Sequence, residues 1–119
     1  MQTEFEIDNP LKNLIGRELS GVAFVRDYIQ LQFDDRGLTA INLPSVIANG
    51  EAKIPDHQGY RDLLCERIGH TVVEAELNDG EGIWLKFDDD SVVSISLKNE
   101  DYIGPEAAIM YIDERTWVW

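Results

Sequence analysis

The sequence reads YIQLQFDD over residues 28–35 and GIWLKFDD over residues 82–89. In both stretches an isoleucine, a leucine and a phenylalanine occupy every second position, and two aspartates follow. This two-residue period predicts strands that each bury one face. The aspartates favour turns because their side chains hydrogen-bond to nearby backbone groups. The residues expected to point inward are Ile29, Leu31, Phe33, Ile83, Leu85 and Phe87.

The similarity continues on both sides of these stretches. Aligning Ile15-Gly16 with Ile68-Gly69, and allowing one extra residue at Glu81, gives nine identities over 29 aligned pairs. An ordered set of matches of this kind indicates an internal duplication. We therefore expect a single domain over residues 1–119 that contains two copies of one unit, at about residues 8–43 and 60–97.

Both copies predict the same order of elements. A short helix opens each copy, over residues 10–15 with Asp8 or Asn9 as its cap and over residues 60–68, and a glycine ends each helix. Three strands follow, near residues 19–25, 28–33 and 38–43 in the first copy and 72–77, 83–87 and 92–97 in the second. The third strands are expected to bury Thr39, Ile41, Leu43, Val93, Ile95 and Leu97.

The connections between these strands predict the fold class. Asn78-Asp79-Gly80 is a tight-turn sequence, and Asp34 to Gly37 has the residue pattern of a type I turn. Tight turns give antiparallel neighbours, so we expect an α+β fold with a mostly antiparallel sheet. Its two short-helix-plus-three-strand units would form one curved or partly closed sheet about a pseudo-twofold axis. The tail, residues 104–119, predicts a further hairpin, and the linker, residues 44–59, predicts a surface loop.

The charge of the chain restricts its partners. The net charge is −13, with −4 on residues 1–60 and −9 on residues 61–119. Such a surface repels phosphate, so we expect no nucleic-acid partner, and it attracts a basic protein. Acidity that serves solubility alone is the other interpretation. Residues 1–8 have no apolar signal-peptide core and no apolar stretch is long enough to span a membrane, so we expect a cytoplasmic location.

No motif indicates an enzyme, a cofactor or a metal. The sequence has no nucleophile elbow, no phosphate-binding glycine loop and no zinc-protease motif. The aspartates at 34–35 and 88–90 could bind a hard cation, but they lack the calcium-loop spacing and stand where turns are needed. Cys65 is expected to be a helix cysteine rather than a nucleophile, His70 to bond to the end of its helix, and His57 to be solvated. We therefore expect a non-enzyme with no cofactor and no metal.

The outward positions of the predicted strands differ between the copies. In the second copy they carry charge and one large aromatic residue. The candidate binding residues on and around this face are Glu74, Glu76, Asp79, Glu81, Trp84, Asp88, Asp89 and Asp90. The matching face of the first copy is uncharged, with Gly21, Ala23, Val25, Tyr28, Gln30 and Gln32. Helices could cover that face as part of the core, or it could be an interface, for example in a homodimer.

The duplicated Ile-Gly positions, the paired Phe-Asp-Asp turns and the tail from Gly104-Pro105 to Trp117-Val118-Trp119 carry a resemblance. In these features the chain resembles small acidic immunity proteins of bacterial polymorphic and contact-dependent toxin systems, and uncharacterised bacterial domains are similar. The resemblance implies that carboxylates bind and neutralise a basic toxin domain without catalysis. The alternative is a ligand-binding or enzymatic module with its site at the seam between the copies.

Overall fold

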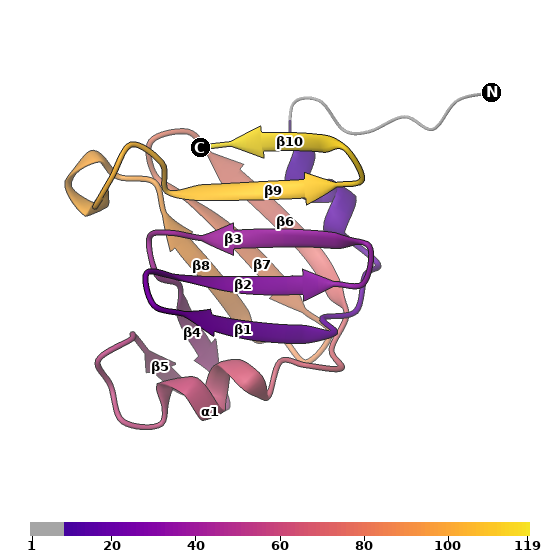
Figure 1. Cartoon of the computed structure of the whole chain (residues 1–119). Helices are drawn as coiled ribbons and strands as arrows, with labels where there is room; N and C mark the ends of the chain where they lie inside the picture. The colour runs from indigo at the N-terminus through magenta and orange to yellow at the C-terminus, as the bar shows by residue number, and fades with distance from the viewer. Residues whose placement is uncertain (1–8) are drawn as a thin grey trace.

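Within residues 9–119, which the computed structural model describes, ten strands form two antiparallel sheets that pack face to face (Figure 1). The first sheet contains, in spatial order, β1 (Gly21–Val25), β2 (Tyr28–Phe33), β3 (Arg36–Ala40), β9 (Ala108–Ile112) and β10 (Arg115–Val118). The second contains β5 (Glu51–Lys53), β4 (Ser45–Ala48), β8 (Val92–Ser96), β7 (Gly82–Phe87) and β6 (Val72–Asn78). The predicted predominance of antiparallel sheet is confirmed.

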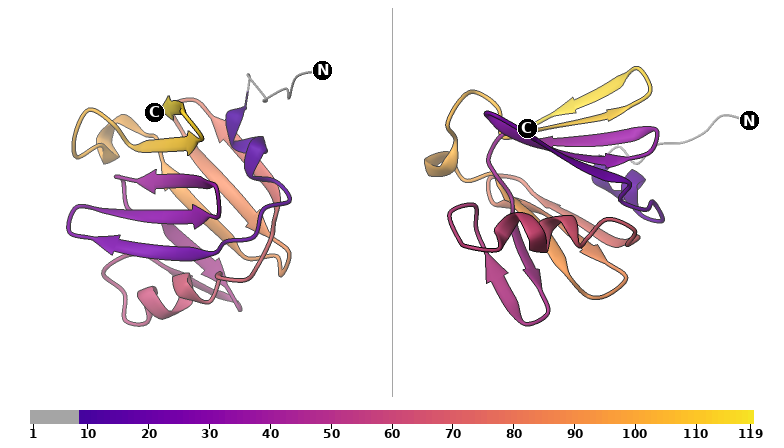
Figure 2. Two further views of the ribbon diagram at one scale, coloured as in Figure 1. Left: turned by 45° about the vertical axis from the view of Figure 1, so that its right-hand side comes forward. Right: turned by 60° about the horizontal axis from the view of Figure 1, so that its bottom comes forward.

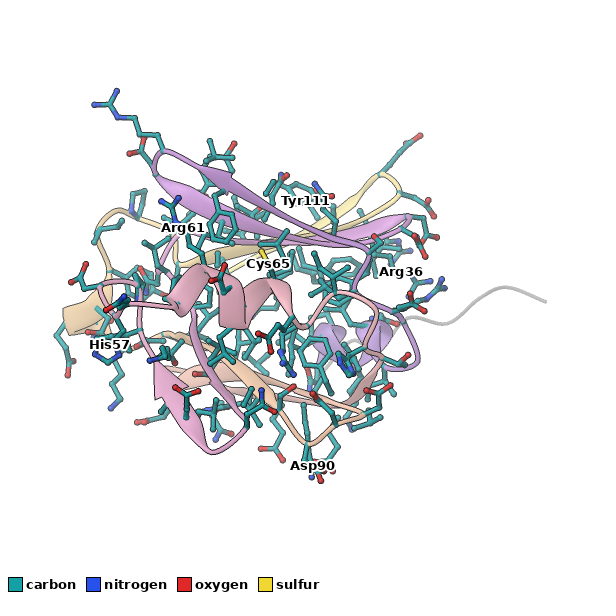
Figure 3. All side chains as sticks on the ribbon, turned by 90° about the horizontal axis from the view of Figure 1, so that it is seen from below. Arg36, His57, Arg61, Cys65, Asp90 and Tyr111 are labelled. Carbon is teal, nitrogen blue, oxygen red and sulfur yellow. The ribbon has the colours of Figure 1, made fainter. Side chains whose placement is uncertain are left out.

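Helices are short and lie at the margins of the sheets. The 3-10 helix η1 (Pro10–Leu14) packs along β6, and the Asn9 side chain caps it by accepting from the Leu11 N–H. Asp8, the other predicted cap, lies outside the described residues. The helix α1 (Tyr60–Cys65) lies at the side of the sandwich between the sheets (Figure 2). Arg61, labelled in Figure 3, projects from this helix, and its guanidinium stacks 5.2 Å from the centroid of the Phe24 ring. None of the helices in residues 9–119 has the length and apolar character needed to cross a membrane.

The two predicted meanders lie in different sheets, so the expectation of one curved sheet is wrong. The linker, predicted as a surface loop, contains the hairpin β4–β5, and β4 pairs with β8. Its turn, Asn49-Gly50, has positive φ at both residues (54° and 77°), the conformation that two-residue hairpins favour. The predicted C-terminal hairpin is confirmed and pairs with β3. Each meander is therefore completed by a different hairpin.

Side chains from the two inner faces form the core. All six residues expected to point inward from β2 and β7 are at most 4% exposed, which confirms the inward face of these strands. The third strand of the first copy differs from expectation. β3 ends at Ala40, and the register places Leu38 and Ala40 on its inner face. The prediction that Thr39, Ile41 and Leu43 point inward is therefore wrong: Thr39 is 4% exposed but lies on the outer face, Ile41 is only half-buried, and Leu43 is 42% exposed.

The difference comes from the turns that precede the third strands. Asp34-Asp35, with φ of 62° at Asp34, links β2 directly to Arg36, so the predicted type I turn ending at Gly37 does not form. The turn between β7 and β8 is one residue longer, with residues 88–90 between Phe87 and Ser91. The third strands are therefore displaced by one residue relative to the sequence alignment.

Backbone hydrogen bonds join the two halves where each helix leads into its first strand. Glu18 and Thr71 form an isolated antiparallel bridge. The N–H to O=C bonds around it run from Gly16 to Val72 (2.8 Å), Gly69 to Leu19 (2.8 Å), Leu19 to His70 (2.9 Å) and Val72 to Arg17 (2.9 Å). Each bond therefore has a counterpart in which the two halves exchange roles. Gly16 and Gly69 also share a left-handed backbone, with φ of 88° and 94°.

Candidate functional site

The predicted binding residues all belong to the β6–β7 hairpin and the turns at the two ends of β7. Glu74 and Glu76 lie on β6, and Trp84 lies on β7. Asp79 and Glu81 are at the β6–β7 turn, whereas residues 88–90 form the β7–β8 turn at the opposite end of the strand. The structure thus spreads these residues along one strand pair and does not gather them at one point.

Trp84 occupies the middle of the outer face of the second sheet. The strand register places Glu76, Trp84, Ser94 and Ser45 next to one another across β6, β7, β8 and β4. The indole lies over Gly82, because a Cβ at that residue would be 3.1 Å from two atoms of the ring. Such a distance is closer than a normal contact, so the missing side chain at Gly82 allows the ring to lie along the strand.

Trp84 borders a groove of about 510 Å³ at the end of the sandwich, where the chain crosses from one sheet to the other. Apolar side chains in its lining are unusually exposed: Leu43 at 42%, Ile54 at 47% and Ile103 at 73%. Glu81 and Asp101 also line the groove, together with the cation of Lys98. Exposed apolar side chains that gather around an aromatic residue are typical of binding sites.

The polar groups of the groove are mostly paired with one another. The hydroxyls of Ser45 and Ser94 share a hydrogen bond of 2.7 Å, and Ser96 donates to Asp101 Oδ2 at 2.5 Å. Asn42, which is 5% exposed, donates through Nδ2 to the Ser96 carbonyl at 2.8 Å. Its Oδ1 is buried and accepts no hydrogen bond from residues 9–119. A ligand with a donor that reached this oxygen would remove the penalty of leaving it unpaired.

Asp89, at the other end of β7, belongs to a structural ion pair. Its Oδ2 accepts from Nη1 of Arg67 at 2.5 Å, and the Arg67 side chain is only 2% exposed. Partial burial acts to raise the pKa of Asp89, but the hydrogen bonds from Ser91 and the guanidinium of Arg67 outweigh it and lower the pKa to about 2. Asp89 therefore compensates a buried cation and has little capacity left for a partner.

Asp88 is also engaged within the chain. His70 Nδ1 lies 2.6 Å from Asp88 Oδ1, so the His70 side chain bonds to this carboxylate. Its bond to the last carbonyls after the helix comes from the backbone instead, where the His70 N–H donates to the Arg67 carbonyl at 3.0 Å. The hydrogen bond from His70, with a second from the Thr71 N–H, holds the pKa of Asp88 below its ordinary value.

His70, Asp88 and Asp89 are the one group in residues 9–119 whose ligand atoms could surround a metal ion, since these atoms lie within 4.8 Å of one another. The guanidinium of Arg67 already occupies Asp89 and would repel a cation. Cys65, on α1 and half-buried, and His57, exposed in the linker, do not join this group (Figure 3). We therefore interpret the cluster as an ion-pair network that fastens the β7–β8 turn.

Sequence reasoning predicted Trp84 and the acidic residues but missed the groove beside them. Its apolar walls come from three connections that are far apart in the chain. One local signal existed, because Leu43 and Ile54 each precede a proline and Ile103 precedes Gly104-Pro105. The residue directly before a proline is held in an extended conformation, which applies to Leu43 and Ile54. The chain matches no protein-family model, no curated protein and no solved structure in the comparisons with known proteins.

Proposed function

We propose that the protein is a non-catalytic binding module that holds a basic protein on the outer face of its second sheet. The observation that carries this proposal is the position of Trp84, beside an apolar groove that Glu81 and Asp101 also line. A lysine or arginine of the partner would lie over the indole and near these carboxylates. A neighbouring apolar side chain of the partner would fill the groove, as anchor residues do at interfaces.

The acidic residues differ in their capacity to attract such a partner. Lys86 lies 3.7 Å from Glu74 and 3.6 Å from Asp90, so it partly neutralises both. Glu76 and Glu81 form no ion pair with any residue of the described chain, and both are exposed. Glu76 lies beside Trp84 on the neighbouring strand and Glu81 lines the groove, so both leave negative charge available next to the indole. Charges of this kind accelerate association more than they increase affinity.

An immunity protein that neutralises a toxin domain in the cytoplasm is the form of this function that we favour. Three features support binding in place of catalysis. They are the acidity of the chain, the apolar groove beside Trp84, and the role of His70, Asp88 and Asp89 as a structural ion-pair network. The predicted partner is a basic domain.

Capture of the partner from extracts of the native cell tests the proposal. Glu76→Lys/Glu81→Lys and Trp84→Ala should each lose the captured protein, because they reverse the charge and remove the anchor. Asp27→Lys/Glu114→Lys is a matched control, because it changes the net charge equally at exposed turns of the first sheet. Retention by both test variants, or equal loss from the control, would contradict the proposal.

A small-molecule ligand in the groove is the second candidate, and the unpaired, buried Oδ1 of Asn42 favours it. The lining of the groove includes neither Glu18 nor Thr71, so this site would lie away from the seam where it was expected. A thermal-shift screen tests it. A compound that binds here should stabilise the wild-type protein and lose most of its effect in Trp84→Ala.

We also propose that the two meanders are duplicated units related by a pseudo-twofold axis through the Glu18–Thr71 bridge, in a fold of the α+β class. Support comes from the backbone hydrogen bonds around the bridge, which occur in pairs that exchange the halves. The matching left-handed backbone at Gly16 and Gly69 supports it as well. The bonds from Leu19 to His70 and from Val72 to Arg17 are those of any antiparallel bridge. The support therefore lies in the additional pair, from Gly16 to Val72 and from Gly69 to Leu19.

A further inference from the structure

The outer face of the first sheet has no charged side chain. Two rows cross all five strands on this face, according to the strand register. One row is Ala23, Gln30, Thr39, Ile109 and Val118, and the other is Gly21, Gln32, Gly37, Tyr111 and Thr116. Val25 and Tyr28 begin a third row at the β1–β2 end. Charged residues make up 28% of the chain, so a continuous sheet face without any is a marked exception.

Nothing in residues 9–119 covers this face. It is the surface toward the viewer in Figure 1, and α1 lies to one side between the sheets (Figure 2). The interpretation that helices cover this face as core is therefore wrong. Several apolar side chains on it are exposed, with Val25 at 42%, Tyr111 at 36% and Val118 at 51%. Figure 3 shows Tyr111 on the side of the molecule opposite Asp90.

The centre of the face is low in relief. The Tyr111 ring lies over Gly37, 3.5 Å from the position that a Cβ would take, and Thr39 Oγ1 hydrogen-bonds to Tyr111 Oη at 3.3 Å. Gln32 similarly lies over Gly21, with its Oε1 2.7 Å from the corresponding position. The side chains of Tyr111 and Gln32 therefore occupy the space that side chains at Gly37 and Gly21 would take. Such a face can pack against another sheet, as the inner faces of sandwiches do.

We propose that this face binds a second copy of the chain, face to face about a twofold axis. Two molecules that each carry a net charge of −13 repel one another wherever their carboxylates meet. The outer face of the first sheet lets two copies pack without opposing carboxylates within the interface. An isologous contact would also place Gln30 and Gln32 where their amides can bond to those of the other copy.

A basic partner is a weaker candidate for this face, because nothing on it selects a cation. Charge would direct such a partner to the second sheet instead. A dimer through the first sheet would leave the second sheet of each copy facing outward, so both functions could operate together. The self-association therefore does not depend on the proposed partner binding.

Strand geometry sets the expected strength of the dimer. Five strands about 4.8 Å apart and about 17 Å long give a projected area of roughly 400 Å² per copy. This area is about half of the 800 Å² per partner of a standard stable interface. We therefore expect a weak dimer that forms only at high protein concentration.

Sedimentation equilibrium of the full chain tests the proposal. The dissociation constant should fall severalfold between about 0.05 M and about 0.5 M NaCl, because salt screens the repulsion between the acidic copies. Gln30→Glu adds a charge without changing the shape of the side chain and, through the twofold axis, brings two like charges into the interface. It should weaken the dimer at least about tenfold. Gln58→Glu, the same change at an exposed linker residue, is the matched control and should leave the dimer unchanged.

A second variant is needed in case Gln30→Glu impairs folding. Val118→Glu alters an exposed residue on the edge strand β10 and should weaken the dimer as well. Circular dichroism and the melting temperature of each variant report on folding separately. A protein that stays monomeric up to about 1 mM at both salt concentrations would overturn the proposal, and so would a dimer that folded Gln30→Glu and Val118→Glu both retain.

Discussion

Arg67 and Asp89 are the pair of residues on which the β7–β8 end of the structure most depends. Arg67 is nearly fully buried, and Asp89 is the charge closest to its guanidinium. Asp89→Asn should lower the free energy of unfolding by about 2–4 kcal/mol, because it leaves the buried cation with only the exposed carboxylate of Glu66, 3.7 Å away. Asp90→Asn is the matched control, and it should cost under about 0.5 kcal/mol because the Asp90 side chain is 89% exposed.

Removal of both charges separates the ion pair from the packing around it. Arg67 aligns with Leu14, which is fully buried at the corresponding position of the first helix. Arg67→Leu in the Asp89→Asn background should therefore recover part of the lost stability, as replacements of buried ion pairs by apolar residues often do. Chemical denaturation of the single and double variants gives the coupling energy. Additive losses would show that the two side chains do not act as a pair.

The lowered pKa of Asp89 implies that the free energy of unfolding depends on pH in the acid range. The pKa is about 2 in the folded chain and 3.8 ordinarily, so the unfolded chain binds more protons than the folded chain between these values. Stability that Asp89 contributes is thus complete above about pH 4 and is lost as the pH falls toward 2. Urea denaturation at pH 5 and pH 2.5 should show a smaller pH-dependent loss in Asp89→Asn than in the wild type. An equal loss would contradict the assigned cause.

Gly82 determines how Trp84 is presented. A methyl group at this residue would lie 3.1 Å from the indole and 3.1 Å from the Ile95 carbonyl oxygen. Gly82→Ala should therefore displace the ring, change its fluorescence emission and weaken partner binding. Gly104→Ala is the control, because no atom lies within 4 Å of the added group. Unchanged emission in both variants would show that Gly82 does not position the ring.

At the scale of elements, local patterns predicted what each strand buries but not which strands pair. β2 and β7 were predicted because their two-residue period is strict, and the C-terminal hairpin because its turn is short. The linker hairpin was missed although Asn49-Gly50 is a strong turn signal, because its flanking strands are only three and four residues long. The pairing of β3 with β9 and of β4 with β8 depends on contacts between distant segments, which have no local signature.

The displaced third strands make an element-scale prediction. Leu43 and Leu97 are identical in the sequence alignment, yet Leu43 is 42% exposed and Leu97 is 4% exposed. Leu97→Ala should lower the free energy of unfolding by about 2–5 kcal/mol, because it leaves a cavity in the core. Leu43→Ala should lower it by under about 1 kcal/mol. Equal losses in chemical denaturation would mean that the alignment, and not the observed register, describes the third strands.

At the scale of the whole molecule, the two outer sheet faces have opposite character. The second sheet carries carboxylates around Trp84, and the first carries no charge. The sequence predicted this difference because outward positions follow from the period of each strand. It could not predict the groove, because the wall residues Leu43, Ile54 and Ile103 meet only when the connections between the sheets are in place.

The association rate constant of the captured basic partner tests the central claim most directly. Stopped-flow tryptophan fluorescence should show at least a tenfold decrease in the association rate constant between ionic strengths of about 0.02 M and 0.2 M, because salt screens the attraction to the acidic face. Glu76→Lys/Glu81→Lys should associate slowly at both ionic strengths, while Asp27→Lys/Glu114→Lys should stay close to the wild type. A rate constant that neither salt nor the reversal of Glu76 and Glu81 changes would contradict the account.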